Sequence, residues 1–268
     1  GCSRVMTTDR KWALILGVSS GFGAATARCL AAEGWDILGV HLDRRSTMPA
    51  VEALQAELAA SGRAVHFFNG NAADDDFRAA TVSALADITE DAGGRIGVFM
   101  HSLAFGTLAP LISNGESRSA TRKQLEMTID VMANSLVYWT QDLVAADLIG
   151  PGRIFAMTSE GSEKAWPLYG PVSAAKAALE SYVRQLGQEL SGRSITVNAV
   201  MAGVTRTPAL EKIPGSDHLM DKALSKNPHN RLTQPDDVAR AIAELARPGT
   251  HWINMNVIRI DGGESTSA

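Results

Sequence analysis

The fold is indicated by one stretch near the start of the chain, Leu14-Ile15-Leu16-Gly17-Val18-Ser19-Ser20-Gly21-Phe22-Gly23. A short apolar run, which predicts a strand, ends at this stretch, and an alanine-rich run that predicts a helix follows it over residues 24–32. Glycines allow a tight turn in which a pyrophosphate can approach backbone N–H groups and the helix N-terminus. A strand–helix connection that binds nothing is the alternative. The position of the turn, after the first predicted strand and before the first helix, favours a dinucleotide site, although its spacing is GxxxGxG and not GxGxxG.

Apolar runs of strand length alternate with amphipathic stretches along the rest of the chain. The predicted strands are residues 12–16, 37–42, 64–68, 96–101, 153–158, 195–200 and 257–260. The predicted helices are residues 24–32, 50–60, 77–91, 125–148, 173–190 and 235–246. Because parallel neighbours need crossover connections, this order predicts an α/β fold, a doubly wound parallel seven-stranded sheet of the Rossmann type with helices on both faces. Ligands then bind at the carboxyl ends of the strands, where we expect residues 113–123 and 208–231 to form loops over the site.

The composition predicts a single domain over residues 1–268. With 45% hydrophobic residues the chain can bury one large core. Its formal charge of -4 offers no basic field to nucleic acid, and no apolar run approaches the ~18 residues of a membrane span. Cys2 and Cys29 are expected to be free thiols in a reducing cytoplasm. Residues 1–9 are expected to be a flexible leader, and the scattered histidines predict no metal site.

The residues after the second predicted strand, His41-Leu42-Asp43-Arg44-Arg45, are expected to meet an adenosine ribose. An acid there accepts hydrogen bonds from the ribose hydroxyls and favours NAD, whereas arginines pair with a 2′-phosphate and favour NADP. The acid stands later after the strand than is typical of proteins that prefer NAD, and two arginines follow it. NADP(H) is therefore favoured over NAD(H). Asn71, at the end of the third strand, is a candidate partner of the adenine amino group or a turn residue.

Three residues that can transfer or stabilise a proton stand in chain order after the fifth predicted strand: Ser159, Tyr169 and Lys176. A lysine beside the nicotinamide ribose is expected to lower the pKa of a nearby phenol, so that the tyrosine can donate a proton near neutral pH. A serine hydroxyl would bind the same substrate oxygen. Each residue type is common, and only their joint placement at the carboxyl edge of the sheet indicates catalysis.

At these residues the chain resembles the short-chain dehydrogenase/reductase superfamily, from Gly17 to the Asp261-Gly262-Gly263 that follows the last strand. Further matches are Ala202-Gly203-Val204-Thr205-Arg206-Thr207 after the sixth strand and Asn134 before the fifth. The resemblance implies that the former lies against the nicotinamide and the phosphates. It also implies that Asn134 holds a proton-relay water, the alternative being a helix residue bonded to a neighbouring carbonyl. The candidate cofactor-binding residues are then Gly17, Ser19, Ser20, Gly21, Phe22, Gly23, Leu42, Asp43, Arg44, Asn71, Ala72, Ser102, Leu103, Lys176, Val204, Thr205 and Thr207.

The spacing of the tyrosine departs from the commoner branch of the superfamily. That branch has tyrosine four residues before lysine, where this chain has Val172, and Tyr169 stands seven residues before Lys176. Three residues of helix correspond to a rise of ~4.5 Å, so the phenol is displaced along the site. The YxxxxxxK spacing and the strip His101-Ser102-Leu103-Ala104-Phe105 are both similar to the divergent branch of the enoyl-acyl-carrier-protein reductases.

This resemblance implies reduction of the 2,3 double bond of a trans-2-enoyl thioester on coenzyme A or acyl-carrier protein. Hydride would go to C3, and Tyr169 would stabilise or protonate the enolate. Many members have a second tyrosine where this chain has Ser159, so a keto/hydroxy oxidoreductase is the alternative within the superfamily. A non-catalytic dinucleotide sensor is a further alternative, because a fold alone does not fix function. The helices 125–148 and 173–190 match those that pair subunits in the superfamily, which predicts a homotetramer.

Overall fold

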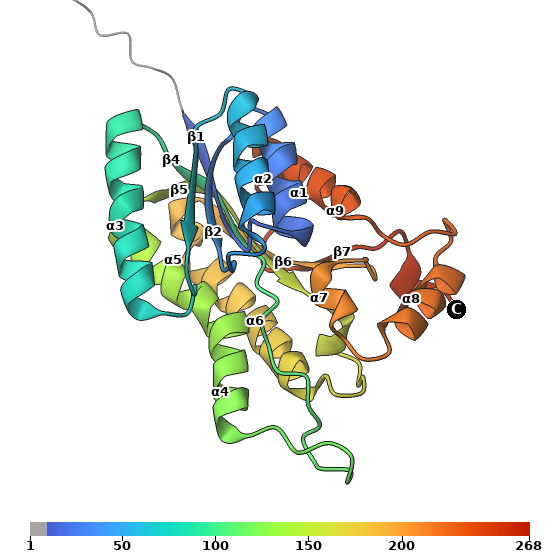
Figure 1. Cartoon of the computed structure of the whole chain (residues 1–268). Coiled ribbons are helices and arrows are strands. Elements are labelled where there is room, and N and C mark those ends of the chain that lie inside the picture. Colours follow the sequence, from blue (N-terminus) through green and yellow to red (C-terminus); the bar gives the residue numbers. More distant parts are fainter. Residues whose placement is uncertain (1–9) are drawn as a thin grey trace, which may run out of the picture.

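The computed structural model describes residues 10–268, so the expected leader over residues 1–9 lies outside the described residues. Its strands form one seven-stranded parallel sheet in the order β3-β2-β1-β4-β5-β6-β7 (Figure 1). The strands are β1 Lys11–Leu16, β2 Asp36–His41, β3 Val65–Asn69, β4 Arg95–His101, β5 Ile149–Thr158, β6 Ile195–Ala202 and β7 Val257–Ile260. The order reverses between β1 and β4, which is the point where doubly wound sheets bind ligands. The predicted fold class is confirmed.

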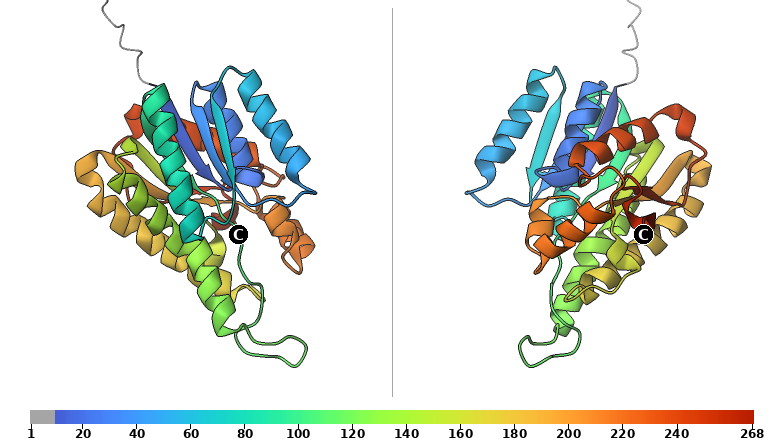
Figure 2. Two further views of the ribbon diagram at one scale, coloured as in Figure 1. Left: turned by 60° about the vertical axis from the view of Figure 1, so that its left-hand side comes forward. Right: turned by 90° about the vertical axis from the view of Figure 1, so that its right-hand side faces the viewer.

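Helices cover both faces of the sheet, as Figure 2 shows. The main helices are α1 Gly21–Ala32, α2 Met48–Ala60, α3 Asp75–Ala92, α5 Ser135–Ala145, α6 Gly170–Glu189 and α9 Pro235–Leu245. Because successive side chains of a strand point to opposite faces of the sheet, the apolar core has two parts, one on each face. From β1, Leu14 and Leu16 point into the core beneath α3, α5 and α6, whereas Ala13 and Ile15 pack under α1, α2 and α9.

The helix predicted over residues 125–148 is interrupted. The structure has α4 Arg122–Ile129, a π-helical segment Asp130–Asn134, and then α5. The side chain of Ser135 donates to the carbonyl of Val131, and that of Thr140 to the carbonyl of Leu136. A π segment changes which side chains face the core, and hydrophobic periodicity alone does not reveal it because the apolar residues continue through it.

The expectation of a loop over residues 208–231 is wrong in part, because this segment contains α7 Pro208–Glu211 and α8 Ser216–Lys226. Thr207 caps α7 by accepting a hydrogen bond from the backbone N–H of Leu210, and proline occupies the first turn. The segment 113–121 has no helix or strand, as expected, before Thr121 caps α4. Within residues 10–268, no helix has both the length and the apolarity that crossing a membrane requires.

Candidate active site

The glycine turn brings the end of β1 against the end of β4. Gly17 has a φ of +87°, and a Cβ at this position would overlap the carbonyl oxygen of Ser102. A Cβ at Gly23 would in turn overlap the carbonyl oxygen of Gly17. Only glycine allows this approach, and the N–H groups of Gly17 and Val18 bond to the carbonyl of Val40 at the end of β2, which fixes the turn at the sheet edge.

The N-terminus of α1 is suited to bind an anion. Its N-cap residue, Ser20, is extended and makes no side-chain capping hydrogen bond. Thr207, from the loop after β6, lies beside Gly21, where its methyl group would be 3.6 Å from a Cβ. The glycine turn and the loop after β6 therefore face each other across one site, which fits the pyrophosphate and nicotinamide of a dinucleotide.

Asp43 follows β2 and lies beside Ser19 of the glycine turn. Its carboxylate is 3.0 Å from His41 Nδ1 and is also hydrogen-bonded by Ser19 and Thr47. Burial raises the pKa of Asp43, but these hydrogen bonds outweigh it and lower the pKa below the usual value. An ionised carboxylate is thus held next to the glycine turn, whereas Arg44 is exposed.

The other predicted adenine-side residues have mixed surroundings. The side chain of Asn71 accepts a hydrogen bond from the N–H of Ala73, which forms a turn, and the buried Ala72 offers its carbonyl to the indole of Trp139. Leu42 is exposed at 59%, and Leu103 packs against the core under α3 and α5.

The structure brings Ser159 and Tyr169 together. The two hydroxyl oxygens are 2.9 Å apart, and the serine oxygen also accepts from the N–H of Gly161 at 3.1 Å. Tyr169 is the N-cap residue of α6 and is buried. A Cβ at Gly161 would overlap the Tyr169 ring, so glycine is what lets the phenol lie across this segment.

Lys176 lies one and a half turns into α6 and is buried. Its ammonium group donates to the carbonyl oxygen of Met157 at 2.7 Å. Burial lowers the pKa of Lys176 to about 8, against a smaller opposing effect of Glu180. The expectation that the lysine lowers the phenol's pKa stays a prediction. Burial raises the pKa of Tyr169, and the opposing effect comes from the hydrogen bond of Ser159.

Asn134 is not brought together with these three residues by any side-chain hydrogen bond. Its side-chain oxygen accepts from the Tyr182 hydroxyl at 2.7 Å, and it lines a shallow surface hollow beside α4 with Lys123 and Asp130. The relay role of Asn134 therefore stays a prediction, and the structure shows its amide bonded to a neighbouring tyrosine.

An apolar cluster of side chains packs around Tyr169, and sequence reasoning did not find its members. The residues packed with Tyr169 are Leu108, Ile129, Met132, Trp166, Val172, Ala175 and Ile213. The ring of Trp166 is 5.0 Å from that of Tyr169, centroid to centroid. Ile213, in the segment between α7 and α8, packs against this cluster, and the covering role of residues 208–231 stays a prediction. These residues lie far apart in sequence, and no motif links them.

The loop after β6 is held by Glu264, which sequence reasoning also missed. Its carboxylate accepts from the N–H of Val204 at 3.1 Å, and Thr205 donates to the carbonyl of Gly203. Burial raises the pKa of Glu264.

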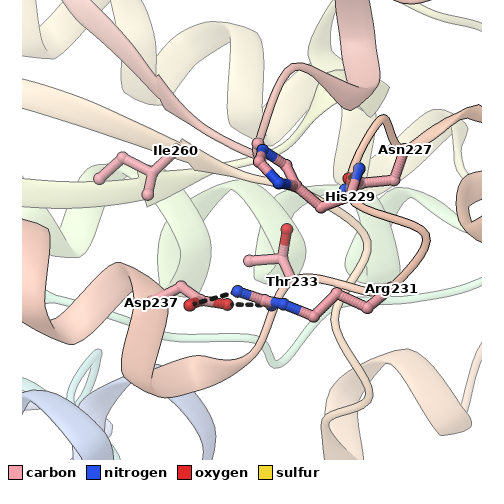
Figure 3. Close-up of a pocket in the computed structure, with 7 residues that line it drawn as sticks. Asn227, His229, Arg231, Thr233, Asp237 and Ile260 are labelled. Atoms are coloured by element: carbon pink, nitrogen blue, oxygen red, sulfur yellow. Dashed lines mark hydrogen bonds and ion pairs between the residues drawn. The ribbon is translucent and has the colours of Figure 1, made fainter.

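Behind this loop is a separate small cavity, shown in Figure 3, where Arg231 forms a two-pronged ion pair with Asp237 at 2.7 and 2.9 Å. Thr233 lines the cavity and lies directly beneath Gly203.

The sheet order, the glycine turn and the Ser159, Tyr169 and Lys176 group are features of a short-chain dehydrogenase/reductase, an oxidoreductase class. The model of the enoyl-(acyl carrier protein) reductase family matches residues 17–265. The chain therefore belongs to this family.

Three relatives illustrate the breadth of the similarity. The chain is 30% identical to the (2S)-[(R)-hydroxy(phenyl)methyl]succinyl-CoA dehydrogenase subunit BbsD of Thauera aromatica over 98% of this chain and 100% of that protein. It is 27% identical to the monensin polyketide synthase putative ketoacyl reductase of Streptomyces virginiae over 94% of this chain and 95% of that protein. The crystal structure of the NADH-dependent enoyl-[acyl-carrier-protein] reductase of Aquifex aeolicus superposes with a TM-score of 0.81 at 23% identity, over 96% of this chain and 97% of that one.

Proposed function

We propose that the protein reduces the 2,3 double bond of a trans-2-enoyl thioester, carried by coenzyme A or acyl-carrier protein, with a nicotinamide cofactor. The observation that carries the proposal is the position of Tyr169. Its hydroxyl reaches Ser159 from the very start of α6, and its ring belongs to an apolar cluster of side chains against which an acyl chain could pack. The family match supports the same reaction class.

The residues present fit a dinucleotide. The glycine turn and the uncapped N-terminus of α1 would hold the pyrophosphate, and Lys176 would bind the nicotinamide ribose. Val204 and Thr205 would lie against the nicotinamide. When bound, the cofactor supplies the hydride that adds to C3 of the substrate.

The chain's own residues would handle the negative charge that the reduction creates. As charge builds on the thioester oxygen, the Tyr169 hydroxyl would donate a hydrogen bond to it, and Ser159 would orient that hydroxyl. The ammonium group of Lys176 would add positive charge at the same end of the site. The surrounding apolar side chains would exclude water and so strengthen these interactions.

The test compares the protein with Tyr169→Phe on short and medium trans-2-enoyl-CoA, following oxidation of NADH and NADPH. We expect kcat to fall by ~10²-fold or more in the variant, because a positioned proton donor contributes about that much. Unchanged binding of the cofactor would be the control for folding. No turnover with any enoyl thioester, despite tight cofactor binding, would overturn the proposal.

A keto/hydroxy oxidoreductase is the second candidate, because the 2.9 Å contact between Ser159 and Tyr169 would bind a ketone oxygen equally well. Comparing the activity on crotonyl-type thioesters with that on acetoacetyl-type thioesters distinguishes the two reactions. Activity confined to the acetoacetyl substrate, with a ~10²-fold loss in Ser159→Ala, would favour this candidate.

For the cofactor we infer a preference for NADH, opposite to the one that the two arginines predict from the sequence. The ionised Asp43 beside Ser19 would repel a 2′-phosphate and accept from ribose hydroxyls. We expect Asp43→Ala to shift the ratio of kcat/KM values toward NADPH by ~10-fold, about 1.4 kcal/mol. Arg44→Ala is the matched control. If Asp43→Ala left the ratio unchanged and Arg44→Ala shifted it toward NADH, the unchanged enzyme would prefer NADPH, and the inference would be wrong.

A further inference from the structure

His101 is a fully buried histidine at the carboxyl end of β4, paired in the sheet with Leu16 of β1 and Ala156 of β5. Its Nε2 is 2.7 Å from the hydroxyl oxygen of Ser135. That hydroxyl is also 2.7 Å from the carbonyl oxygen of Val131, which can only accept. The single proton of Ser135 therefore goes to Val131, and the serine oxygen accepts from His101 Nε2–H. This chain of hydrogen bonds fixes the tautomer of His101 and leaves a lone pair on Nδ1.

The Nδ1 atom of His101 is buried and has no hydrogen-bond partner among the described residues. A buried acceptor normally has one. The charged group nearby is the ammonium of Lys176, whose one side-chain hydrogen bond in the structure goes to Met157, on the strand beside His101. An ammonium has three N–H donors, so Lys176 has donors to spare where His101 has a spare acceptor. Burial, followed by the charge of Lys176, lowers the pKa of His101 to about 3, so the ring stays neutral and the acceptor persists at working pH.

We propose that His101 is a positioning residue for Lys176, in which Nδ1 accepts a hydrogen bond from a water molecule that also binds the ammonium, and so helps to hold the ammonium at the carbonyl of Met157. The inference deepens the proposed function and rests on it for the role of Lys176. One other ionisable group, Glu180 of α6, acts on the ammonium, and its charge raises the pKa of Lys176. Glu180 is itself bound by the hydroxyls of Thr158 and Ser162.

The proposal predicts a difference between two variants of His101. In His101→Asn the side-chain oxygen stands where Nδ1 was, whereas His101→Gln places its amide where Nε2 was and removes the Nδ1 acceptor. An acceptor stabilises the charged lysine, so its loss lowers the pKa of Lys176. We expect His101→Gln to lower this pKa by about one unit and His101→Asn to leave it near that of the unchanged protein.

The measurement is the pH titration of the Lys176 side-chain ¹³C resonance in lysine-labelled protein, assigned with Lys176→Arg. The alkaline limb of the kcat/KM profile should move to lower pH in His101→Gln by the same amount. Because the titration needs no substrate, it can succeed even where the proposed reaction is wrong. Equal shifts in both variants would mean that His101 acts through packing alone, and no shift in either would mean that it does not contact the lysine; both results overturn the proposal.

A second measurement covers the case in which either variant fails to fold. The imidazole ¹⁵N spectrum of the unchanged protein should show His101 protonated at Nε2 and unprotonated at Nδ1 across neutral pH. A proton on Nδ1 would overturn the proposal without any substitution.

Discussion

Single residues set the distances within the site, and two glycines do so by having no side chain. Gly17 lets the glycine turn touch the end of β4, and Gly161 leaves room for the ring of Tyr169. Around the phenol, Ser159 and the apolar side chains define what the hydroxyl meets. The chemistry thus depends on close approaches that a single added methyl group would prevent.

Gly161→Ala should therefore damage the site. The added methyl group must displace the Tyr169 ring, and a shift of the order of 1 Å at a reacting group costs ~10²-fold in rate. Overpacking should also lower the free energy of unfolding by ~1–3 kcal/mol. Steady-state kinetics and denaturant unfolding measure the two effects. The matched control is Gly192→Ala, where a Cβ meets nothing within 4 Å, and both quantities should stay unchanged there. Full activity in Gly161→Ala would show that the ring position is unimportant.

Burial of Lys176 should make stability depend on pH. Its pKa falls from 10.5 to about 8 on folding, so the unfolded chain binds more protons between these values and the free energy of unfolding rises with pH from about 8 to 10.5. Below pH 8 the free energy of unfolding is therefore lower by about 3 kcal/mol than above pH 10.5, on account of this one group. Denaturant unfolding of the protein and of Lys176→Met at pH 7 to 10 tests this. The variant should be the more stable at pH 7, and its advantage should shrink toward pH 10. A constant difference would contradict the burial effect.

At the scale of elements, irregular segments build the site on a regular sheet. The π-helical segment Asp130–Asn134 brings Ser135 to His101 and Met132 to Tyr169. The segment between α7 and α8 supplies Ile213 to the same apolar cluster. In the proposed site, the strands and α1 would hold the cofactor, whereas these segments would shape the substrate side.

Ile213→Ala should weaken the binding of longer substrates more than that of short ones. The substitution removes apolar contact next to Tyr169, which corresponds to about 2 kcal/mol for a medium acyl chain that packs there. KM for medium-chain enoyl-CoA should rise ~10-fold or more, with little change for crotonyl-CoA. Lys212→Ala, one residue earlier and exposed, is the control. An equal rise in KM for both chain lengths would indicate general loosening of the segment.

At the scale of the whole molecule, one sheet separates two cores, and the site lies where the strand order reverses. The core under α3, α5 and α6 supports the candidate catalytic residues, because Ser159 follows β5 and Lys176 lies on α6. The core under α1, α2 and α9 supports the glycine turn. Loosening either core should disturb one half of the site.

We expect the protein to assemble as a homotetramer through the exposed faces of α5 and α6. Sedimentation equilibrium should then give a mass about four times the 28.4 kDa of one chain. A mass of one chain across micromolar concentrations would rule the assembly out.

The sequence by itself determined the sheet, the order of its elements and the identity of the glycine turn and of Ser159, Tyr169 and Lys176. These depend on local signals, namely the period of apolar residues, glycine spacing and distances along one helix. Only the tertiary structure decided that Asp43 contacts Ser19, that Gly161 and Trp166 enclose Tyr169, and that the helix before β5 contains a π segment. It also showed that burial governs the pKa of both Tyr169 and Lys176. These features arise where segments distant in sequence are packed against each other, and side-chain contacts, close approaches and desolvation do not exist until the chain has folded.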